Sequence, residues 1–112
     1  MVEDILTRLT AEFLKTLSHP VRIRILRMLT PGELCVCELI TGIDIEQSNL
    51  SQHLSVLKKQ GIIESRKEGT KVFYRILHPS VLEVIKATEK TIGDQLNESQ
   101  SLLKQLKKGD GN

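Results

Sequence analysis

The spacing of apolar and polar residues over positions 48–59 predicts an amphipathic helix. Leu50, Leu54 and Leu57 recur at intervals of four and three residues, which places them on one side of a helix. The opposite side carries short hydrogen-bonding side chains and one cation, namely Ser48, Gln52, Ser55 and Lys59, with Ser51 at its edge. Such side chains suit the floor of a DNA major groove, where base edges present donors and acceptors at close range. An ordinary surface helix shows the same pattern, so the flanking segments must decide between the two interpretations.

The residues before position 31 predict two helices. Residues 3–17 repeat apolar side chains at helical spacing. Residues 20–30 begin with a proline, which suits a first helical position, and they are apolar on most sides. A helix of that kind is packed between neighbours, so we expect it at the centre of the fold. Pro31 and Gly32 end it.

A short third helix is expected over residues 33–41, closed by Gly42. Residues 43–46 then form a tight turn, and the amphipathic helix begins at Glu46 or Gln47. Two short helices joined by such a turn, the second with a small-polar face, predict a helix-turn-helix.

After residue 61 the apolar period changes from that of a helix to that of strands. Residues 62–67 and 70–77 predict a hairpin that turns at Glu68-Gly69. Its tip is basic, with Arg66, Lys67 and Lys71. A basic hairpin directly after a helix-turn-helix is typical of a wing that lies along a phosphate backbone.

The last predicted helix covers residues 80–107. Its apolar residues form a narrow seam with spacings typical of a helix that pairs with another helix: Leu82, Ile85, Ile92, Leu96, Leu103 and Leu106. No other segment of the chain is long enough to cover this seam. We therefore expect a homodimer interface, completed by Leu6, Leu9 and Phe13 of the first helix; packing within one chain is the alternative. A single domain over residues 1–107 and a disordered tail over 108–112 complete the prediction.

Composition adds three limits. The net charge is only +2, but cationic residues gather between positions 20 and 76, as expected for a middle that binds a polyanion. Two Phe, one Tyr and no Trp predict a core of Leu, Ile and Val. The sequence shows no signal peptide and no apolar run that would cross a bilayer, so we expect a cytoplasmic protein with no membrane partner and with reduced thiols.

Four segments together resemble the ArsR/SmtB family: His19–Leu26, Glu33–Leu39, Ser51–Leu54 and Gly69–Arg75. The resemblance covers about residues 5–90, in the order that the family shows. It implies a mainly α fold with a small β-hairpin, a dimeric winged helix-turn-helix in which the first and last helices dimerise. It also implies a repressor that leaves its operator DNA when a metal, metalloid or other effector binds.

Combining the polar helical face with the basic hairpin, we expect fourteen side chains to contact double-stranded DNA. They are Gln47, Ser48, Asn49, Ser51, Gln52, His53, Ser55, Lys58, Lys59, Arg66, Lys67, Lys71, Tyr74 and Arg75.

The candidate sensor is the pair Cys35 and Cys37. In the family, such a pair resembles the arsenic and cadmium/lead sensors whose ligands lie on the third helix. The chain departs from those sensors because position 40 is Ile instead of a third cysteine and no cysteine precedes the pair. A zinc site on the last helix is not expected either, since that helix contains no His. Two cysteines from one subunit do not complete a tetrahedral zinc site.

Both cysteines fall within the expected third helix, where residues i and i+2 point about 200° apart. Any agent that joins the two sulfurs must then unwind the helix locally, which predicts a switch. The expected effector is a thiophilic metalloid or metal, with As(III), Sb(III), Cd(II) or Cu(I) as candidates, and no permanent cofactor. Oxidation of the pair is the alternative.

A small thiol oxidoreductase is a second and weaker alternative. Enzymes of that class carry their cysteine pair after a strand of an α/β fold, whereas the surroundings here are helical and basic. The sequence contains no nucleophile triad, phosphate loop or paired-carboxylate motif, so we do not expect an enzyme. A winged helix used only for protein contacts is a third possibility, which DNA binding with a steep salt dependence distinguishes.

Overall fold

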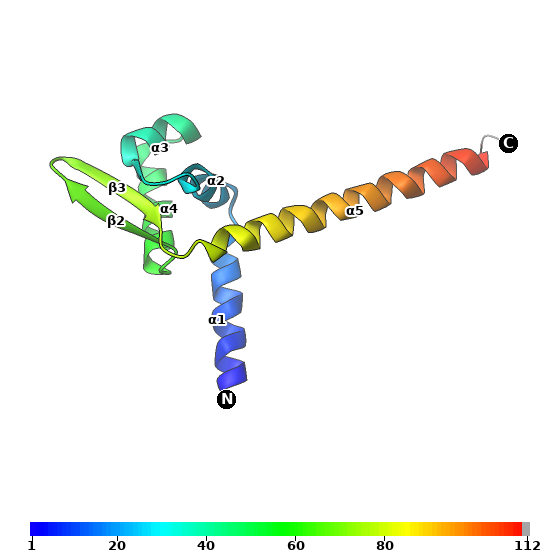
Figure 1. Ribbon diagram of the computed structural model, residues 1–112, viewed down its shortest axis with the longest axis horizontal. Helices are drawn as coiled ribbons and strands as arrows, with labels where there is room; N and C mark the ends of the chain where they lie inside the picture. Colours follow the sequence, from blue (N-terminus) through cyan, green and yellow to red (C-terminus); the bar gives the residue numbers. More distant parts are fainter. Residues whose placement is uncertain (111–112) are drawn as a thin grey trace. The chain divides into compact units, whose positions relative to one another are not determined.

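The structure is a computed structural model that describes residues 1–110. Within these residues, five helices and three short strands follow one another (Figure 1): α1 (Val2–Leu17), α2 (Pro20–Leu29), β1 (Leu34–Cys35), α3 (Val36–Ile43), α4 (Gln47–Lys59), β2 (Ile63–Glu68), β3 (Lys71–Ile76) and α5 (Ser80–Asp110). The protein is mainly helical with a small antiparallel sheet, and the predicted winged helix-turn-helix class is confirmed.

Contacts within the chain divide it into two compact units, Met1–Leu82 and the remainder of α5 from Glu83. The single domain expected over residues 1–107 stays a prediction. Helix α5 continues through residues 108–110, which were expected in the tail, while residues 111–112 lie outside the described part. No helix within residues 1–110 has both the length and the apolar character needed to span a membrane.

Helix α2 lies at the centre of the first unit, as predicted, and contacts α1, α3, α4 and β3. Ile25 and Leu26 are completely buried, and Leu29 is 2% exposed. The largest fully buried side chains are all aliphatic: Ile25, Leu26, Leu39, Ile43, Leu50, Leu54, Leu57, Ile62 and Ile63. The predicted core of Leu, Ile and Val is therefore confirmed, with Leu and Ile as its largest members and Val81 also buried. Burial of this apolar surface is the main stabilising contribution.

The sheet contains a strand that the sequence analysis did not anticipate. Strand β3 pairs antiparallel with β2 on one side and with β1 on the other. Leu34 lies opposite Tyr74, and Cys35 lies opposite Phe73. The predicted third helix over residues 33–41 is therefore wrong at its start, because these two residues extend to satisfy backbone hydrogen bonds of β3.

The same helix also ends later than predicted. Gly42 lies inside α3, and Asp44 ends the helix in a left-handed conformation with φ 59°. The Asp44 N–H donates to the Ile40 carbonyl at 3.0 Å, which satisfies one terminal acceptor. A Cβ on Gly42 would overlap the Met28 side chain. Gly42 therefore permits α3 to approach α2 closely, instead of closing the helix.

Much of the predicted dimer seam is exposed in the single chain. Leu6 and Leu9 of α1 are 61% and 51% exposed, and three positions on α5 are exposed to a similar degree: Ile92, Leu96 and Leu103. Phe13 and Leu82 are partly buried. Ile85 is buried within the chain at 8% exposure, which leaves it little surface to offer to a partner.

Two arginines of α2 tie neighbouring helices together. Arg22 donates from its Nε to His53 Nδ1 on α4 at 3.2 Å and from a terminal nitrogen to the Thr16 carbonyl of α1, also at 3.2 Å. Arg24 donates to the carbonyl of Ile43 at the end of α3 at 3.2 Å. These cations, which the charge distribution suggested for polyanion binding, thus position the helices. Hydrogen bonds from a charged donor contribute more than neutral ones do.

The α2–α4 contact contains a histidine whose pKa is shifted. His53 is partly buried, and its ring lies 4.3 Å from that of His19, between centroids. Burial lowers the pKa of His53 below its ordinary value of 6.5, and the nearby His19 and Arg22 lower the same pKa further. The neutral ring is therefore the form that the fold accommodates, because only it accepts the Arg22 hydrogen bond.

We expect the free energy of unfolding to decrease as the pH falls from ~7.5 to ~5.5, because the unfolded chain protonates His53 near its ordinary pKa of about 6.5 while the folded chain resists protonation. Denaturant unfolding at several pH values measures this slope. His53→Gln retains an acceptor for Arg22 without titrating, so its slope should be smaller. His78→Gln, which alters an exposed histidine, is the matched control. Equal slopes for wild type and His53→Gln would contradict the assignment.

Candidate nucleic-acid interface and cysteine pair

Helix α4 presents the polar face that its sequence predicts. Leu50, Leu54 and Leu57 are at most 1% exposed. Six of the side chains expected to contact DNA are exposed on this helix: Gln47, Ser48, Asn49, Ser51, Gln52 and Ser55. Most of them are short and uncharged, so they offer hydrogen-bond donors and acceptors without repelling phosphate.

The remaining expected contacts on α4 differ in their surroundings. His53 faces α2 through Arg22 and His19, so the structure gives it a role in packing the helix. Lys58 donates from Nζ to the Ser65 hydroxyl at 2.8 Å, which joins the end of α4 to β2. Lys59 is exposed and makes no ion pair among the residues that the structure describes.

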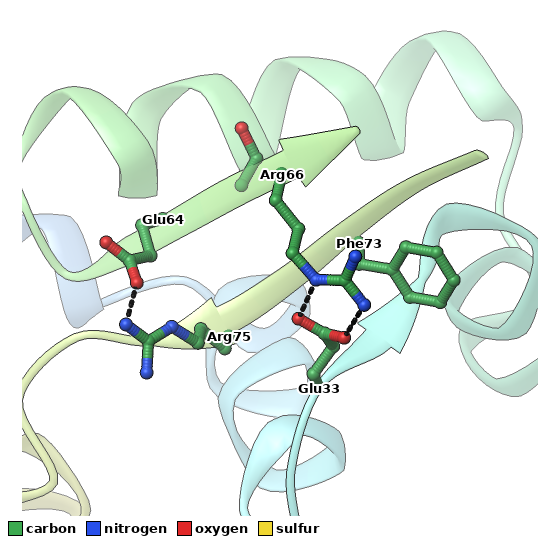
Figure 2. Close-up of a pocket in the computed structure, with 6 residues that line it drawn as sticks. Glu33, Glu64, Arg66, Phe73 and Arg75 are labelled. Atoms are coloured by element: carbon green, nitrogen blue, oxygen red, sulfur yellow. Dashed lines mark hydrogen bonds and ion pairs between the residues drawn. The ribbon is translucent and has the colours of Figure 1, made fainter. Parts of the chain in front are cut away.

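One face of the hairpin carries a set of paired charges that lines a pocket (Figure 2). Arg66 donates two hydrogen bonds to Glu33, one of them at 2.8 Å, and a third to Glu68 at 2.9 Å. Its guanidinium also lies 4.7 Å from the centre of the Phe73 ring. The hydrogen bond from Arg66 is the main cause that lowers the pKa of Glu33. Arg66 is therefore held by carboxylates in this structure.

The second arginine on this face is also paired, since Arg75 forms an ion pair with Glu64 on β2. Lys67 and Lys71 differ from both arginines, because they are exposed and have no ion-pair partner within residues 1–110. Tyr74 is partly buried on the central strand. The predicted phosphate contacts thus divide into lysines that are available and arginines that must exchange a carboxylate for a phosphate.

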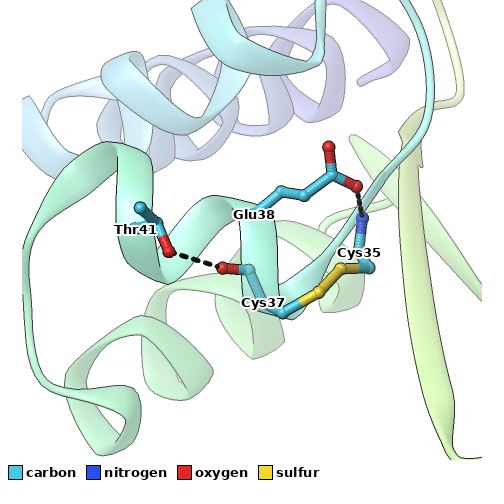
Figure 3. The surroundings of a disulfide bond; sticks show 4 residues. All are labelled: Cys35, Cys37, Glu38 and Thr41. Atoms are coloured by element: carbon cyan, nitrogen blue, oxygen red, sulfur yellow. Dashed lines mark hydrogen bonds between the residues drawn. A yellow bond between two sulfur atoms is a disulfide. The ribbon is translucent and has the colours of Figure 1, made fainter.

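The cysteine pair stands at the start of α3, where strand changes to helix (Figure 3). Cys35 is the N-cap and is extended, with φ −80° and ψ 160°, whereas Cys37 is the second helical residue. Their Cα atoms are 5.3 Å apart, and their sulfurs are joined as a disulfide. The expectation of two separate reduced thiols does not describe this state. The prediction that a bridge requires unwinding is also wrong, because only one of the two cysteines is helical.

Hydrogen bonds fix the backbone around both cysteines. The Glu38 carboxylate accepts from the Cys35 N–H at 3.2 Å, as in a capping box, and the Thr41 hydroxyl donates to the Cys37 carbonyl at 3.0 Å (Figure 3). The two cysteines differ in access: Cys35 is 3% exposed, whereas Cys37 is an exposed residue. One sulfur-bearing residue therefore belongs to the core and the other to the surface.

A groove of about 480 Å³ lies beside the cysteine pair. Cys35 and Cys37 line it together with four of the side chains expected to contact DNA, namely Gln47, Ser51, Lys71 and Tyr74. Sequence reasoning missed this proximity because Lys71 and Tyr74 of β3 lie far along the chain from Cys37. The only hint in the sequence was that the segments containing these residues together resemble one family, and that resemblance gives no distances between side chains. The groove brings the two candidate sites, sulfur pair and DNA-facing surface, into one place.

The donor set at the cysteines is small. Within the described residues, no three side chains of His, Cys, Asp or Glu come together in a group that would hold a metal ion. Two thiolates suit a two-coordinate soft ion, whereas a closed tetrahedral site needs four ligands.

Comparison with known proteins agrees with this architecture. The family model described as "Bacterial regulatory protein, arsR family" matches residues 19–65. The uncharacterised HTH-type transcriptional regulator Rv0081 of Mycobacterium tuberculosis is 37% identical over 110 residues, which cover 97% of this chain and 96% of that protein. Its crystal structure superimposes with a TM-score of 0.76, at 39% identity, over 83% of this chain and 94% of that one.

Two further similar proteins are a homodimeric DNA-binding domain and an arsenic resistance regulator. A winged helix-turn-helix DNA-binding domain of Mycobacterium bovis, solved as a homodimer, has a TM-score of 0.75 at 28% identity and covers 86% of this chain and 89% of its own. The arsenic resistance transcriptional regulator ArsR1 of Pseudomonas putida is 38% identical over 81 residues, which are 71% of this chain and 62% of that protein.

These relatives are regulators of transcription, so the alternative of a thiol oxidoreductase is set aside. The helix-turn-helix of α3 and α4, the hairpin that follows it and the match to the family model lead to one conclusion: the chain belongs to the arsR family of bacterial regulatory proteins and is a DNA-binding transcriptional regulator.

Proposed function

We propose that the protein is a homodimeric repressor whose affinity for operator DNA decreases when the sulfurs of Cys35 and Cys37 are joined. The observation that supports this most directly is the groove in which the pair lies beside Gln47, Ser51 and Lys71. A change at the sulfurs therefore acts next to the side chains expected to contact DNA.

The bridge also links two elements that DNA binding requires. Cys37 belongs to the first turn of α3, and Cys35 belongs to β1, which pairs with β3 of the hairpin. Cys35 is also the N-cap of α3, so the joined sulfurs fix the angle at which β1 continues into α3. When they are thiols, rotation of the backbone at Val36 can change that angle, so that α3 and the hairpin adjust relative to each other on DNA. A coupling of about 1–3 kcal/mol between the bridge and DNA changes the affinity about 5–150-fold.

Oxidation is the effector chemistry that we favour. Given an oxidant, a disulfide needs only two adjacent sulfurs and no third ligand from the protein. A thiophilic metalloid or metal, such as As(III), Sb(III), Cd(II) or Cu(I), is the second candidate. The resemblance to an arsenic resistance regulator supports it, whereas the absence of a third ligand near the pair in residues 1–110 favours oxidation or a two-coordinate ion such as Cu(I).

A DNA-release assay compares these effectors directly. Labelled operator is bound by the reduced protein, and release is measured after peroxide, arsenite, antimonite, Cd(II) or Cu(I) is added separately. Release by peroxide that dithiothreitol reverses supports the redox switch. Release by arsenite alone would support the metalloid instead.

Replacing both cysteines, Cys35→Ser with Cys37→Ser, should leave operator affinity near that of the reduced wild type and abolish the response to peroxide. The reason is that serine preserves the size and the N-cap position but forms no sulfur bridge. Fluorescence anisotropy with and without peroxide measures both quantities. Thr41→Ser, which retains both cysteines, is the control. A double variant still released by peroxide would place the sensor elsewhere.

Gln52 and Lys71 are proposed to contact DNA in different ways, since the first lies on the polar face of α4 and the second is an exposed cation of the hairpin. Gln52→Ala should reduce the preference for operator over other sequences by about 1–3 kcal/mol. Lys71→Ala should weaken binding to all sequences alike and reduce the salt slope by about 1. Titrations at several salt concentrations measure both, with Lys86→Ala as the control. If the two variants changed sequence preference and salt slope in the same way, the proposed roles of Gln52 and Lys71 would be contradicted.

The homodimer is supported by the exposed apolar positions of α1 and α5 and by the homodimeric relative. Leu96→Asp should dissociate the dimer or unfold it, because a carboxylate without a partner in an apolar contact is costly. Sedimentation at micromolar concentration measures the mass. Ser101→Asp adds the same charge on the opposite side of α5 and should leave the mass unchanged. A monomeric wild type would refute the proposal.

A further inference from the structure

The groove beside the cysteine pair has features that a bridge between two sulfurs does not need. Its volume of about 480 Å³ falls in the range of small-molecule sites. Its walls combine apolar side chains, Val36, Ile40 and Val72, with an exposed cation, Lys71. Lys71 has no ion-pair partner in the part of the chain that the structure describes. This combination suits a small anionic molecule that carries both apolar and charged groups.

The two cysteines divide the chemistry between them. Both cysteines line the groove, but Cys37 is exposed, whereas Cys35 is 3% exposed and is held in the sheet through β3. A reagent from solution therefore reaches the sulfur of Cys37 first. The Cys35 sulfur is already within bonding distance of it, as the disulfide shows. Cys37 has the position of an attacking thiol, and Cys35 that of a resolving thiol.

We propose that the groove binds an anionic low-molecular-weight disulfide, whose carboxylate lies on Lys71 while its sulfur exchanges with Cys37. This rests on the proposed function, because it names the oxidant for the same cysteine pair. The Cys37 thiolate attacks one sulfur of the disulfide RSSR; the S–S bond breaks, and RS⁻ leaves with the electron pair. Cys37 is then a mixed disulfide, Cys37–S–S–R.

The second step closes the bridge. The Cys35 thiolate attacks the Cys37 sulfur, expels the second RS⁻ and forms the Cys35–Cys37 disulfide seen in the structure. In total, two protein thiols are oxidised, and one RSSR is reduced to two RSH, which take up the two thiol protons. No further oxidant is needed. While the mixed disulfide lasts, the R group occupies a groove whose walls include Gln47 and Ser51, so it obstructs DNA as well.

The test uses the Cys35→Ser variant, which stops the reaction at the mixed disulfide. Three probes with the same reactive bond and different charge are compared: glutathione disulfide, which is anionic, hydroxyethyl disulfide, which is neutral, and cystamine, which is cationic. Intact-mass spectrometry measures the rate at which each probe adds to Cys37. Each rate is then compared with that of the same variant carrying Lys71→Gln.

Removing the Lys71 charge should slow addition of glutathione disulfide about two- to fivefold, the effect of one exposed ion pair. It should leave hydroxyethyl disulfide unchanged and should accelerate cystamine. Lys67→Gln is the matched control, because Lys67 is an exposed lysine of the same hairpin that does not line the groove. In the Cys35→Ser variant that retains Lys71, high salt should also reduce the preference for glutathione disulfide over cystamine.

If Lys71→Gln and Lys67→Gln changed the rates of probe addition equally, the proposal would be overturned. Such a result would indicate a general electrostatic effect of the basic hairpin instead of a binding site at Lys71. Equally fast addition to Cys35 in the Cys37→Ser variant would overturn the division between the cysteines. Both readouts are independent of DNA. If peroxide releases DNA from the wild type but the probes show no charge preference, the groove site fails while the redox switch stands. If the double serine variant is still released by peroxide, the switch fails whatever the probes show.

Discussion

The fold depends on the burial of α2 between α1, α3, α4 and β3. Ile25 and Leu26 have no exposed surface, and deletion of such side chains from a close-packed core is costly because the surroundings relax only partly. Two arginines from the same helix then fix the neighbours, Arg22 through His53 and Thr16, and Arg24 through the Ile43 carbonyl. Apolar packing thus sets where α4 lies, and charge-assisted hydrogen bonds set how it is oriented. The polar face of α4, which is proposed to contact DNA, is therefore positioned by α2.

The small net charge conceals two populations of cations. Arg22 and Arg24 form hydrogen bonds between the helices, and Arg66 and Arg75 of the hairpin pair with carboxylates. Exposed ion pairs of the latter kind contribute little to stability, so a phosphate competes with them at modest cost. The exposed lysines need no such exchange. The number of basic residues in the sequence is therefore larger than the number of cations that are available to DNA without giving up a partner within the protein.

The position of the cysteine pair at a helix start changes how the proposed sulfur switch would work. Because Cys35 is extended and Cys37 is helical, joining the sulfurs preserves the backbone hydrogen bonds of α3. A switch that works by unwinding would sacrifice several such bonds, each contributing about 1 kcal/mol. A bridge across a strand–helix junction instead ties two elements together at no such cost. In the function proposed above, sensing and DNA contact would meet in one groove, so no long pathway between distant sites would be required.

What the sequence by itself determined was local periodicity and the family motifs. The three-to-four spacing of Leu50, Leu54 and Leu57 was sufficient to predict α4 and its polar face, and alternation was sufficient for β2 and β3. Tertiary structure alone decided the rest. Leu34 and Cys35 read as helical, yet their backbone pairs with Tyr74 and Phe73, which lie far along the chain. Pairing between distant segments leaves no period in the sequence. For that reason neither β1, nor the bridging geometry of the cysteines, nor the groove shared with Lys71 was visible before the chain was folded.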